Sequence, residues 1–211
     1  MKINNLIKKK ALPSFCTSNF DVIQTILYFC KIKKLPCLIE CTSNQVNQNG
    51  GYTKNTPKTF VNKISKICKN LNFKSKNLYL GGDHLGPLPW KNNSKKKAMK
   101  NSIKLIGDFL KQNYCKIHVD TSIKCKDDKY INNEIIFERT KKILNSLGFK
   151  TKSEKKALLE RLNYEYRQCL RVNNHMLSKK YRQLIREAGG HINPFSFLAN
   201  LINREKINSL P

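Results

Sequence analysis

Acidic residues are scarce in this sequence, and arginine is almost absent from its first two thirds. The chain has 14 Asp and Glu against 41 Lys and Arg, which gives a formal net charge of +27, and Arg139 is the only arginine before residue 161. A charge of this size indicates affinity for polyanions, such as nucleic acid or an anionic membrane surface. Lysine, asparagine and isoleucine are enriched together, however, and lysines occur along the whole chain. Compositional drift with incidental polyanion affinity and selected nucleic-acid binding therefore both remain open.

Long apolar runs and paired cysteine motifs are also missing. No run approaches the roughly 20 apolar residues of a membrane helix, so we expect no membrane contact. The first ten residues have lysines but no sustained apolar segment, which argues against a secretory signal. The 8 cysteines include no C-x-x-C pair, so neither a zinc ribbon nor a redox motif is indicated. We expect a soluble cytoplasmic protein whose thiols are reduced.

What the sequence does contain is a regular alternation of short apolar runs and amphipathic segments, which predicts a parallel α/β fold. The short bounded runs indicate strands buried on both faces. The expected strands are 11–16, 37–41, 78–81 and 116–120, and the expected helices are 21–33, 58–71, 94–113 and 132–146. Because the candidate functional groups follow strand ends, a TIM-barrel-like arrangement of (β/α) units is favoured over a doubly wound sheet. Four strands are too few to close such a barrel.

The character of the chain changes near residue 151, where arginines become frequent. The pattern predicts a long helix over 153–188, ended by Gly189-Gly190, and a last short helix over 194–203. We therefore divide the chain into a basic leader (1–10), a partial barrel domain (11–150) and a helical segment of unknown relationship (151–211).

Two strand ends carry the polar residues that are best suited to chemistry. Asp83-His84 follows one apolar run, and the polar, glycine-bearing loop that starts at Glu40 follows another. Carboxylates transfer protons, and imidazole and carboxylate groups bind zinc. A single histidine does not make a zinc site, however, and Glu40 is as well suited to ordering its loop as to binding a sugar.

Three segments give the chain a family resemblance. IECTSNQVNQNGGYT (39–53), LYLGGDHLGPLPW (78–90) and KIHVDTS (116–122) look like the corresponding parts of the non-catalytic (Z) subunit of class II tagatose-1,6-bisphosphate aldolase, the GatZ/KbaZ family. The similarity runs from about residue 14 to about residue 144 in unbroken order and covers only an N-terminal portion of the longer family members. It implies a TIM-barrel-like fold.

The resemblance also implies roles for individual residues. Asp83 matches the proton-transferring aspartate of catalytic relatives, and His84 matches a zinc histidine, whose fellow ligands come from later strands in those enzymes. The substrate-binding residues expected here are Glu40, Ser43, Asn44, Gln45 and Asp120. Zinc is thus a possible cofactor, and a sugar phosphate is a possible ligand.

The leading functional expectation is an auxiliary, chaperone-like subunit in D-tagatose 6-phosphate and galactitol catabolism, truncated and not catalytic alone. Its partner would be the catalytic (Y) subunit of the class II aldolase. Three alternatives stay open: a metal-dependent sugar-phosphate aldolase or epimerase, a basic nucleic-acid-binding protein that uses the arginine-bearing segment, and a decayed gene product without function.

Overall fold

The computed structural model describes residues 12–148 and 152–192. The chain divides into two units, Met1–Leu147 and Gly148–Pro211, which are treated separately below. The predicted leader (1–10) and the predicted short helix (194–203) lie outside the described residues.

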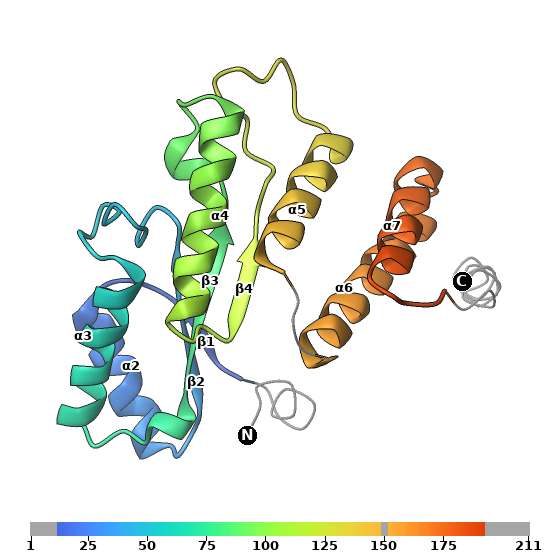
Figure 1. The fold of residues 1–211 in the computed structure, drawn as a ribbon. Helices are drawn as coiled ribbons and strands as arrows, with labels where there is room; N and C mark the ends of the chain where they lie inside the picture. The colour runs from blue at the N-terminus through green and yellow to red at the C-terminus, as the bar shows by residue number, and fades with distance from the viewer. Residues whose placement is uncertain (1–11, 149–151, 193–211) are drawn as a thin grey trace, which may run out of the picture. The chain divides into compact units, whose positions relative to one another are not determined.

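The first unit alternates strands and helices in the predicted order (Figure 1). Two short 3-10 turns, Ser75–Asn77 and Leu88–Trp90, lie before and after the third strand. The elements are β1 (Ser14–Cys16), α2 (Phe20–Ile32), β2 (Cys37–Thr42), α3 (Pro57–Asn70), β3 (Leu78–Leu85), α4 (Lys95–Lys111), β4 (Lys116–Val119) and α5 (Asn133–Leu147).

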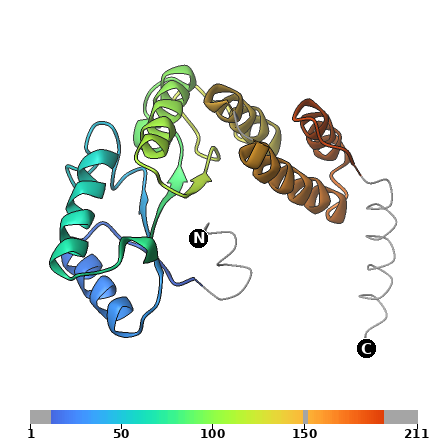
Figure 2. The ribbon, with the colours of Figure 1, turned by 60° about the horizontal axis from the view of Figure 1, so that its bottom comes forward.

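The four strands form one parallel sheet in the order β1-β2-β3-β4. A strand order that follows the chain without reversal is that of (β/α) barrel units, whereas a doubly wound sheet reverses its order at a switch point. Helices α2 to α5 lie along one side of the sheet (Figure 2). The expected α/β fold with TIM-barrel-like units is thus confirmed, as a four-stranded open sheet within the described residues.

Local sequence signals explain where the helices begin. The side chain of Asn19 accepts hydrogen bonds from the amides of Asp21 and Val22 at the start of α2. Thr56 and Thr59 form a capping box at α3, and Pro57 occupies the first turn. These contacts satisfy amides that have no partner inside a helix.

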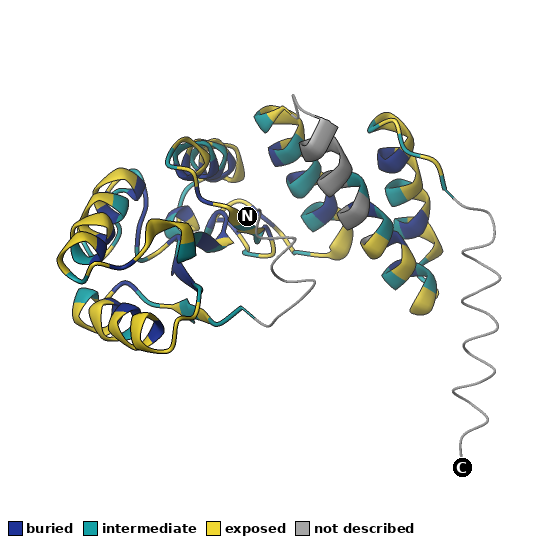
Figure 3. Cartoon of the chain, turned by 90° about the horizontal axis from the view of Figure 1, so that it is seen from below, coloured by how far each residue is buried: buried dark blue, intermediate teal, exposed yellow. Residues whose placement is uncertain are grey.

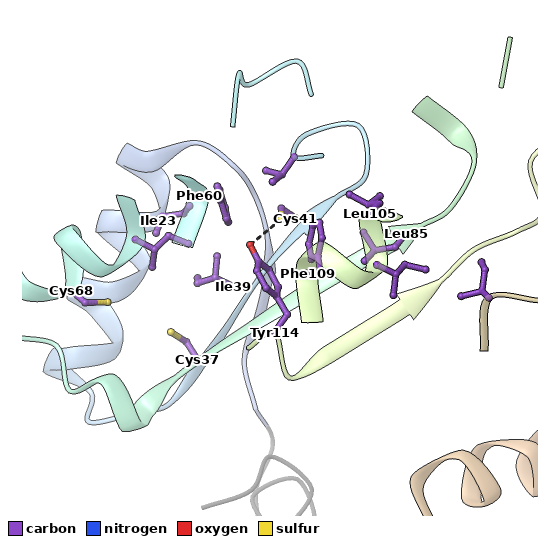
Figure 4. Close-up of a cluster of buried hydrophobic side chains, with 14 of the residues drawn as sticks. Ile23, Cys37, Ile39, Cys41, Phe60, Cys68, Leu85, Leu105, Phe109 and Tyr114 are labelled. Atoms are coloured by element: carbon purple, nitrogen blue, oxygen red, sulfur yellow. Dashed lines mark hydrogen bonds between the residues drawn. The ribbon is translucent and has the colours of Figure 1, made fainter. Parts of the chain in front are cut away.

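The hydrophobic core lies between the sheet and its helices, and most exposed residues lie on the outer sides of those helices (Figure 3). Phe60 of α3 and Phe109 of α4 are fully buried there, together with Ile39 of β2 (Figure 4). The Tyr114 hydroxyl contacts the Cys41 sulfur at 4.0 Å, and burial raises the pKa of that thiol. All eight cysteines are free, and six of them are buried.

Two predictions about the strands need correction. β3 runs to Leu85, so Asp83 and His84 lie inside the strand and not beyond its end. Burial on both faces holds for β2, whereas alternate residues of β1 and β4 are exposed. The reason is that, among the described residues, helices cover only one face of the sheet.

The second unit contains α6 (Lys152–Arg171) and α7 (His175–Glu187), so the single helix predicted over 153–188 was wrong. Asn173 adopts a left-handed backbone with φ of 55°, which ends α6. The side chain of Asn174 then caps α7 by accepting a hydrogen bond from the amide of Leu177 at 3.0 Å. No helix in the described parts of the chain has the length and apolar character needed to cross a membrane.

Two glycines of the first unit should respond oppositely to alanine. A Cβ at Gly82 would lie 2.5 Å from Leu85 Cδ1 and 2.9 Å from Phe109 Cδ1, whereas a Cβ at Gly107 in α4 meets nothing within 4 Å. We expect Gly82→Ala to lower the free energy of unfolding by about 1–3 kcal/mol through overpacking. Gly107→Ala should raise it by up to about 1 kcal/mol through helix propensity. Urea-induced unfolding measures both, and equal effects of the two variants would contradict this packing.

Candidate functional site

A polar cluster lies on the face of the sheet that α2 to α5 leave uncovered, which we call the open face. All four strands contribute to it through hydrogen bonds between their side chains. Its members are Ser14, Cys16, Glu40, Asp83, His84, Lys116 and His118.

Glu40 forms one half of the cluster. Its carboxylate is almost fully buried, and it accepts hydrogen bonds from the Ser14 hydroxyl and from Lys116 Nζ, the latter at 2.6 and 2.8 Å. Glu40 is in register with Gly81, which is in register with Lys116, so the ion pair reaches across β3. A Cβ at Gly81 would lie 2.9 Å from Glu40 Cγ, so only glycine leaves space for this reach. The ammonium group of Lys116 therefore compensates the charge of Glu40.

Asp83 forms the other half. Its two carboxylate oxygens contact His84 Nδ1 and His118 Nδ1, each at 2.8 Å, and the two rings are 4.5 Å apart. Because an ionised carboxylate only accepts hydrogen bonds, both Nδ1 atoms are donors here. Each imidazole then keeps the lone pair on Nε2 for a ligand or a proton.

A β-bulge explains why two consecutive residues of β3 point to the same group. The register between β3 and β4 shifts between Gly82 and Leu85, and His84 has a left-handed φ of 48°. Side chains on a regular strand alternate between faces, so without the extra residue His84 would point into the core. The Ser43 hydroxyl donates to the His84 carbonyl at 2.9 Å and holds this strained peptide.

The surroundings shift the pKa values of Asp83 and Cys16 in opposite directions. Burial alone would raise the pKa of Asp83, but the hydrogen bonds from His118 and His84 outweigh burial and lower it. The Cys16 sulfur lies 3.8 Å from Asp83 Oδ2. Burial, followed by the negative charges of Asp83 and Glu40, raises the pKa of Cys16, so this residue remains a neutral thiol.

The other residues predicted to bind substrate lie outside the hydrogen-bonded cluster. Gln45 accepts a hydrogen bond from the Thr42 amide at 2.8 Å and so folds back onto its own loop. Asn44 is exposed in the same loop. Asp120 lies just beyond β4, and its carboxylate accepts hydrogen bonds from the amide and hydroxyl of Ser122. Substrate binding by these residues stays a prediction.

Sequence analysis did not assign Lys116 or His118 to the site. Both lie on β4 and are two residues apart, and this spacing was the available signal that they share a face of the strand. The spacing alone does not show that Lys116 contacts Glu40 or that His118 contacts Asp83.

The cluster has a donor set that suits zinc. One ligand atom from each of Asp83, His84 and His118 lies within 4.8 Å of the others. Two imidazoles and one carboxylate, with a further position left open, form a common set of protein ligands in catalytic zinc sites. His118 on β4 thus places a second imidazole beside Asp83 and His84, and metal binding by these residues stays a prediction.

These features define a class of fold. The sheet has the strand order of (β/α) barrel units, and the polar cluster lies on the face that would line a barrel. Within the cluster, Asp83 and His84 lie near the carboxyl end of β3, whereas Ser14 and Lys116 are the first residues of β1 and β4.

Comparison with known proteins gives the family. A family model described as D-tagatose-1,6-bisphosphate aldolase subunit GatZ/KbaZ-like matches residues 2–165, and the chain belongs to this family. A crystal structure of a probable tagatose 6 phosphate kinase from Sinorhizobium meliloti 1021 is similar, with a TM-score of 0.62 and 27% sequence identity. The match covers 85% of this chain and 46% of that one, so the present chain spans about half the length of this relative.

The pairing of Asp83 with two histidines should be visible in its titration. In protein freed of metal with EDTA, we expect the Asp83 carboxyl to titrate below the range of an unfolded aspartate, and His118→Ala to move the pKa upward. A carboxylate whose folded pKa is lowered stabilises the fold above its unfolded pKa, and this contribution is lost as the pH falls through the folded pKa.

Carbon-13 NMR of the Asp83 carboxyl group measures the shift in its pKa. His175→Ala, in α7, is the control and should leave the pKa of Asp83 unchanged. If His118→Ala also leaves the pKa of Asp83 unchanged, the pairing is contradicted.

Proposed function

We propose that this protein is an auxiliary, non-catalytic subunit of a class II tagatose-1,6-bisphosphate aldolase. In this role it binds the catalytic subunit and supports its folding and stability, in the cytoplasm, during D-tagatose 6-phosphate and galactitol catabolism. Membership of the GatZ/KbaZ-like family supports the association with such an aldolase.

The observation that carries the non-catalytic role is the state of the two carboxylates. Both oxygens of Asp83 accept hydrogen bonds from imidazoles, and the pKa of this acid is lowered. A general base works best when its pKa lies near the working pH, and a lowered pKa moves Asp83 away from that range. Glu40 is paired with Lys116 and its side chain is almost fully buried, so little of it is accessible to a substrate. The open face is therefore better suited to holding a preformed polar surface than to transferring protons.

The uncovered face also supports a role within a complex. Polar side chains at this face are partly exposed, with His84 and His118 exposed by 54% and 46%. Parallel sheets are nearly always covered on both faces, so an uncovered face favours a partner or a further part of the same protein.

Co-expression with the catalytic subunit tests this proposal. We expect the chain to raise the soluble yield of the catalytic subunit and to slow its thermal inactivation, measured as residual aldolase activity after heating. Asp83→Asn should preserve both effects, because the auxiliary role needs no proton transfer by this residue. A basic protein of similar size and charge serves as the control for general polycation effects. Unchanged yield and unchanged inactivation would remove the auxiliary role.

A second candidate function is favoured by one observation, the convergence of Asp83, His84 and His118. These residues would hold a zinc ion in a metal-dependent sugar-phosphate aldolase or epimerase, and the zinc would act as a Lewis acid that polarises a substrate carbonyl. In this chain, Glu40 and Lys116 would keep the neighbouring strands in register, and Cys16 would pack beside Asp83 as a neutral thiol.

Direct zinc binding separates this candidate from the auxiliary role. The candidate requires about one zinc per chain by elemental analysis. Removing a ligand through His118→Ala should weaken zinc binding by at least about tenfold in calorimetric titration. His175→Ala again serves as the control and should bind as the unchanged protein does. The metal-dependent function is excluded if the protein binds no stoichiometric zinc, or if His118→Ala leaves the zinc affinity unchanged. Neither result would affect the proposed auxiliary role.

A further inference from the structure

A groove between α4 and α5 lies apart from the polar cluster, on the helical side of the sheet. It has a volume of about 460 Å³ and contains atoms from both helices. The lining residues are Ser94, Lys96, Lys97, Lys100, Ile103 and Lys142.

The groove brings together four lysines, none of which has an acidic partner within 12–148 and 152–192. The sequence has no Asp or Glu between Asp83 and Asp108, although it contains six lysines in that interval. Within the described residues, no ion pair involves the four lysines of the groove, whereas the nearby Lys104 pairs with Asp108 at 2.9 Å. An acidic residue, Glu138, lines a separate cavity that Lys142 also borders. Four like charges around one hollow repel one another, and a bound polyanion would offset that repulsion.

The chemistry of the groove suits a chain of phosphates better than a single small anion. Ile103 lines the groove together with the lysines, and the lining contains no arginine that could hold one phosphate in a two-pronged contact. Lysine ammonium groups act as point charges on flexible stems, which suits contacts to successive phosphates of a nucleic-acid backbone. Apolar stems between the charges can lie against sugars.

We propose that the α4–α5 groove binds the phosphodiester backbone of single-stranded nucleic acid, without reading its sequence. Contact is made by Lys96, Lys97 and Lys100 from α4 and by Lys142 from α5. This activity is independent of the aldolase-associated role, because it uses the opposite face of the sheet from the polar cluster.

The test compares two variants of the full chain that lose the same charge. The groove variant is Lys96→Gln, Lys97→Gln, Lys100→Gln and Lys142→Gln. The matched control is Lys58→Gln, Lys66→Gln, Lys69→Gln and Lys74→Gln, which changes exposed lysines in and just after α3. Fluorescence anisotropy with a labelled 20-nucleotide single-stranded RNA, and with the DNA of the same sequence, measures affinity between 50 and 200 mM salt, and circular dichroism checks that both variants fold.

We expect the groove variant to lose at least about tenfold in affinity and the control to lose less than about threefold. The dependence of log affinity on log salt should become shallower by roughly 2–3 in the groove variant, because each lost phosphate contact removes about 0.7 from the slope for single strands. Equal binding of RNA and DNA supports backbone recognition, and a preference for RNA of more than about tenfold would overturn it in favour of contacts to the 2′-hydroxyl.

Three results would overturn the proposal. Absence of binding at the lowest salt would remove the activity. An equal loss in the groove and control variants would attribute binding to the diffuse charge of the whole chain. Displacement of the RNA by millimolar inorganic phosphate at constant ionic strength would reassign the groove to a small phosphate ligand.

Discussion

The ion pair between Glu40 and Lys116 is the contact on which the open face depends. A carboxylate buried to this extent costs several kcal/mol unless a partner compensates its charge. Here the compensation comes from β4, two strands away, because Gly81 on β3 has no side chain in the path. The pair thus fixes the register of three strands on one face. His118, two residues after Lys116, is carried by that register to Asp83.

The β-bulge in β3 is the second feature that shapes the polar cluster. It brings His84 to the face that already holds Asp83, at the expense of a left-handed backbone at a residue that is not glycine. The Ser43 hydroxyl donates a hydrogen bond to the His84 carbonyl, so this residue supports the geometry of the cluster. The resulting group of one carboxylate and two imidazoles has the donors of a zinc site and, when free of metal, a strongly hydrogen-bonded acid. This dual character explains why both an auxiliary and a metal-dependent function fit the same residues.

Charge is used differently on the two sides of the sheet. On the open face, the cationic Lys116 is matched by a buried acid and contributes to the fold. On the helical side, the groove lysines have no such match in the part of the chain that the structure describes, which leaves them available to an external anion. The net charge of +27 is therefore not evenly compensated among the described residues, and the α4–α5 groove is one place where several uncompensated lysines lie together.

The sequence by itself determined the local features. Asn19, Thr56 with Pro57, and Ser94 mark helix starts within one residue of those observed, because caps act on amides only two or three residues away. The apolar runs located all four strands, and Asp83-His84, which the sequence singled out as a candidate, lies in the polar cluster of the open face. The sequence pattern does not reveal the break at Asn173, because the apolar stripe continues with a helical period across it. The break depends on two local features, the left-handed backbone of Asn173 and the cap that Asn174 forms on α7.

Only the tertiary structure decided which side chains meet. Lys116 pairs with Glu40, 76 residues away in the chain, and His118 pairs with Asp83, 35 residues away. Both contacts depend on the register between the strands. The orientation of His84 depends on a bulge whose extra residue is defined only relative to β4. The periodicity of a segment indicates which of its residues lie on the same face of a strand. It does not indicate which residue of a neighbouring strand lies opposite, because the register between strands is set by packing across the whole sheet.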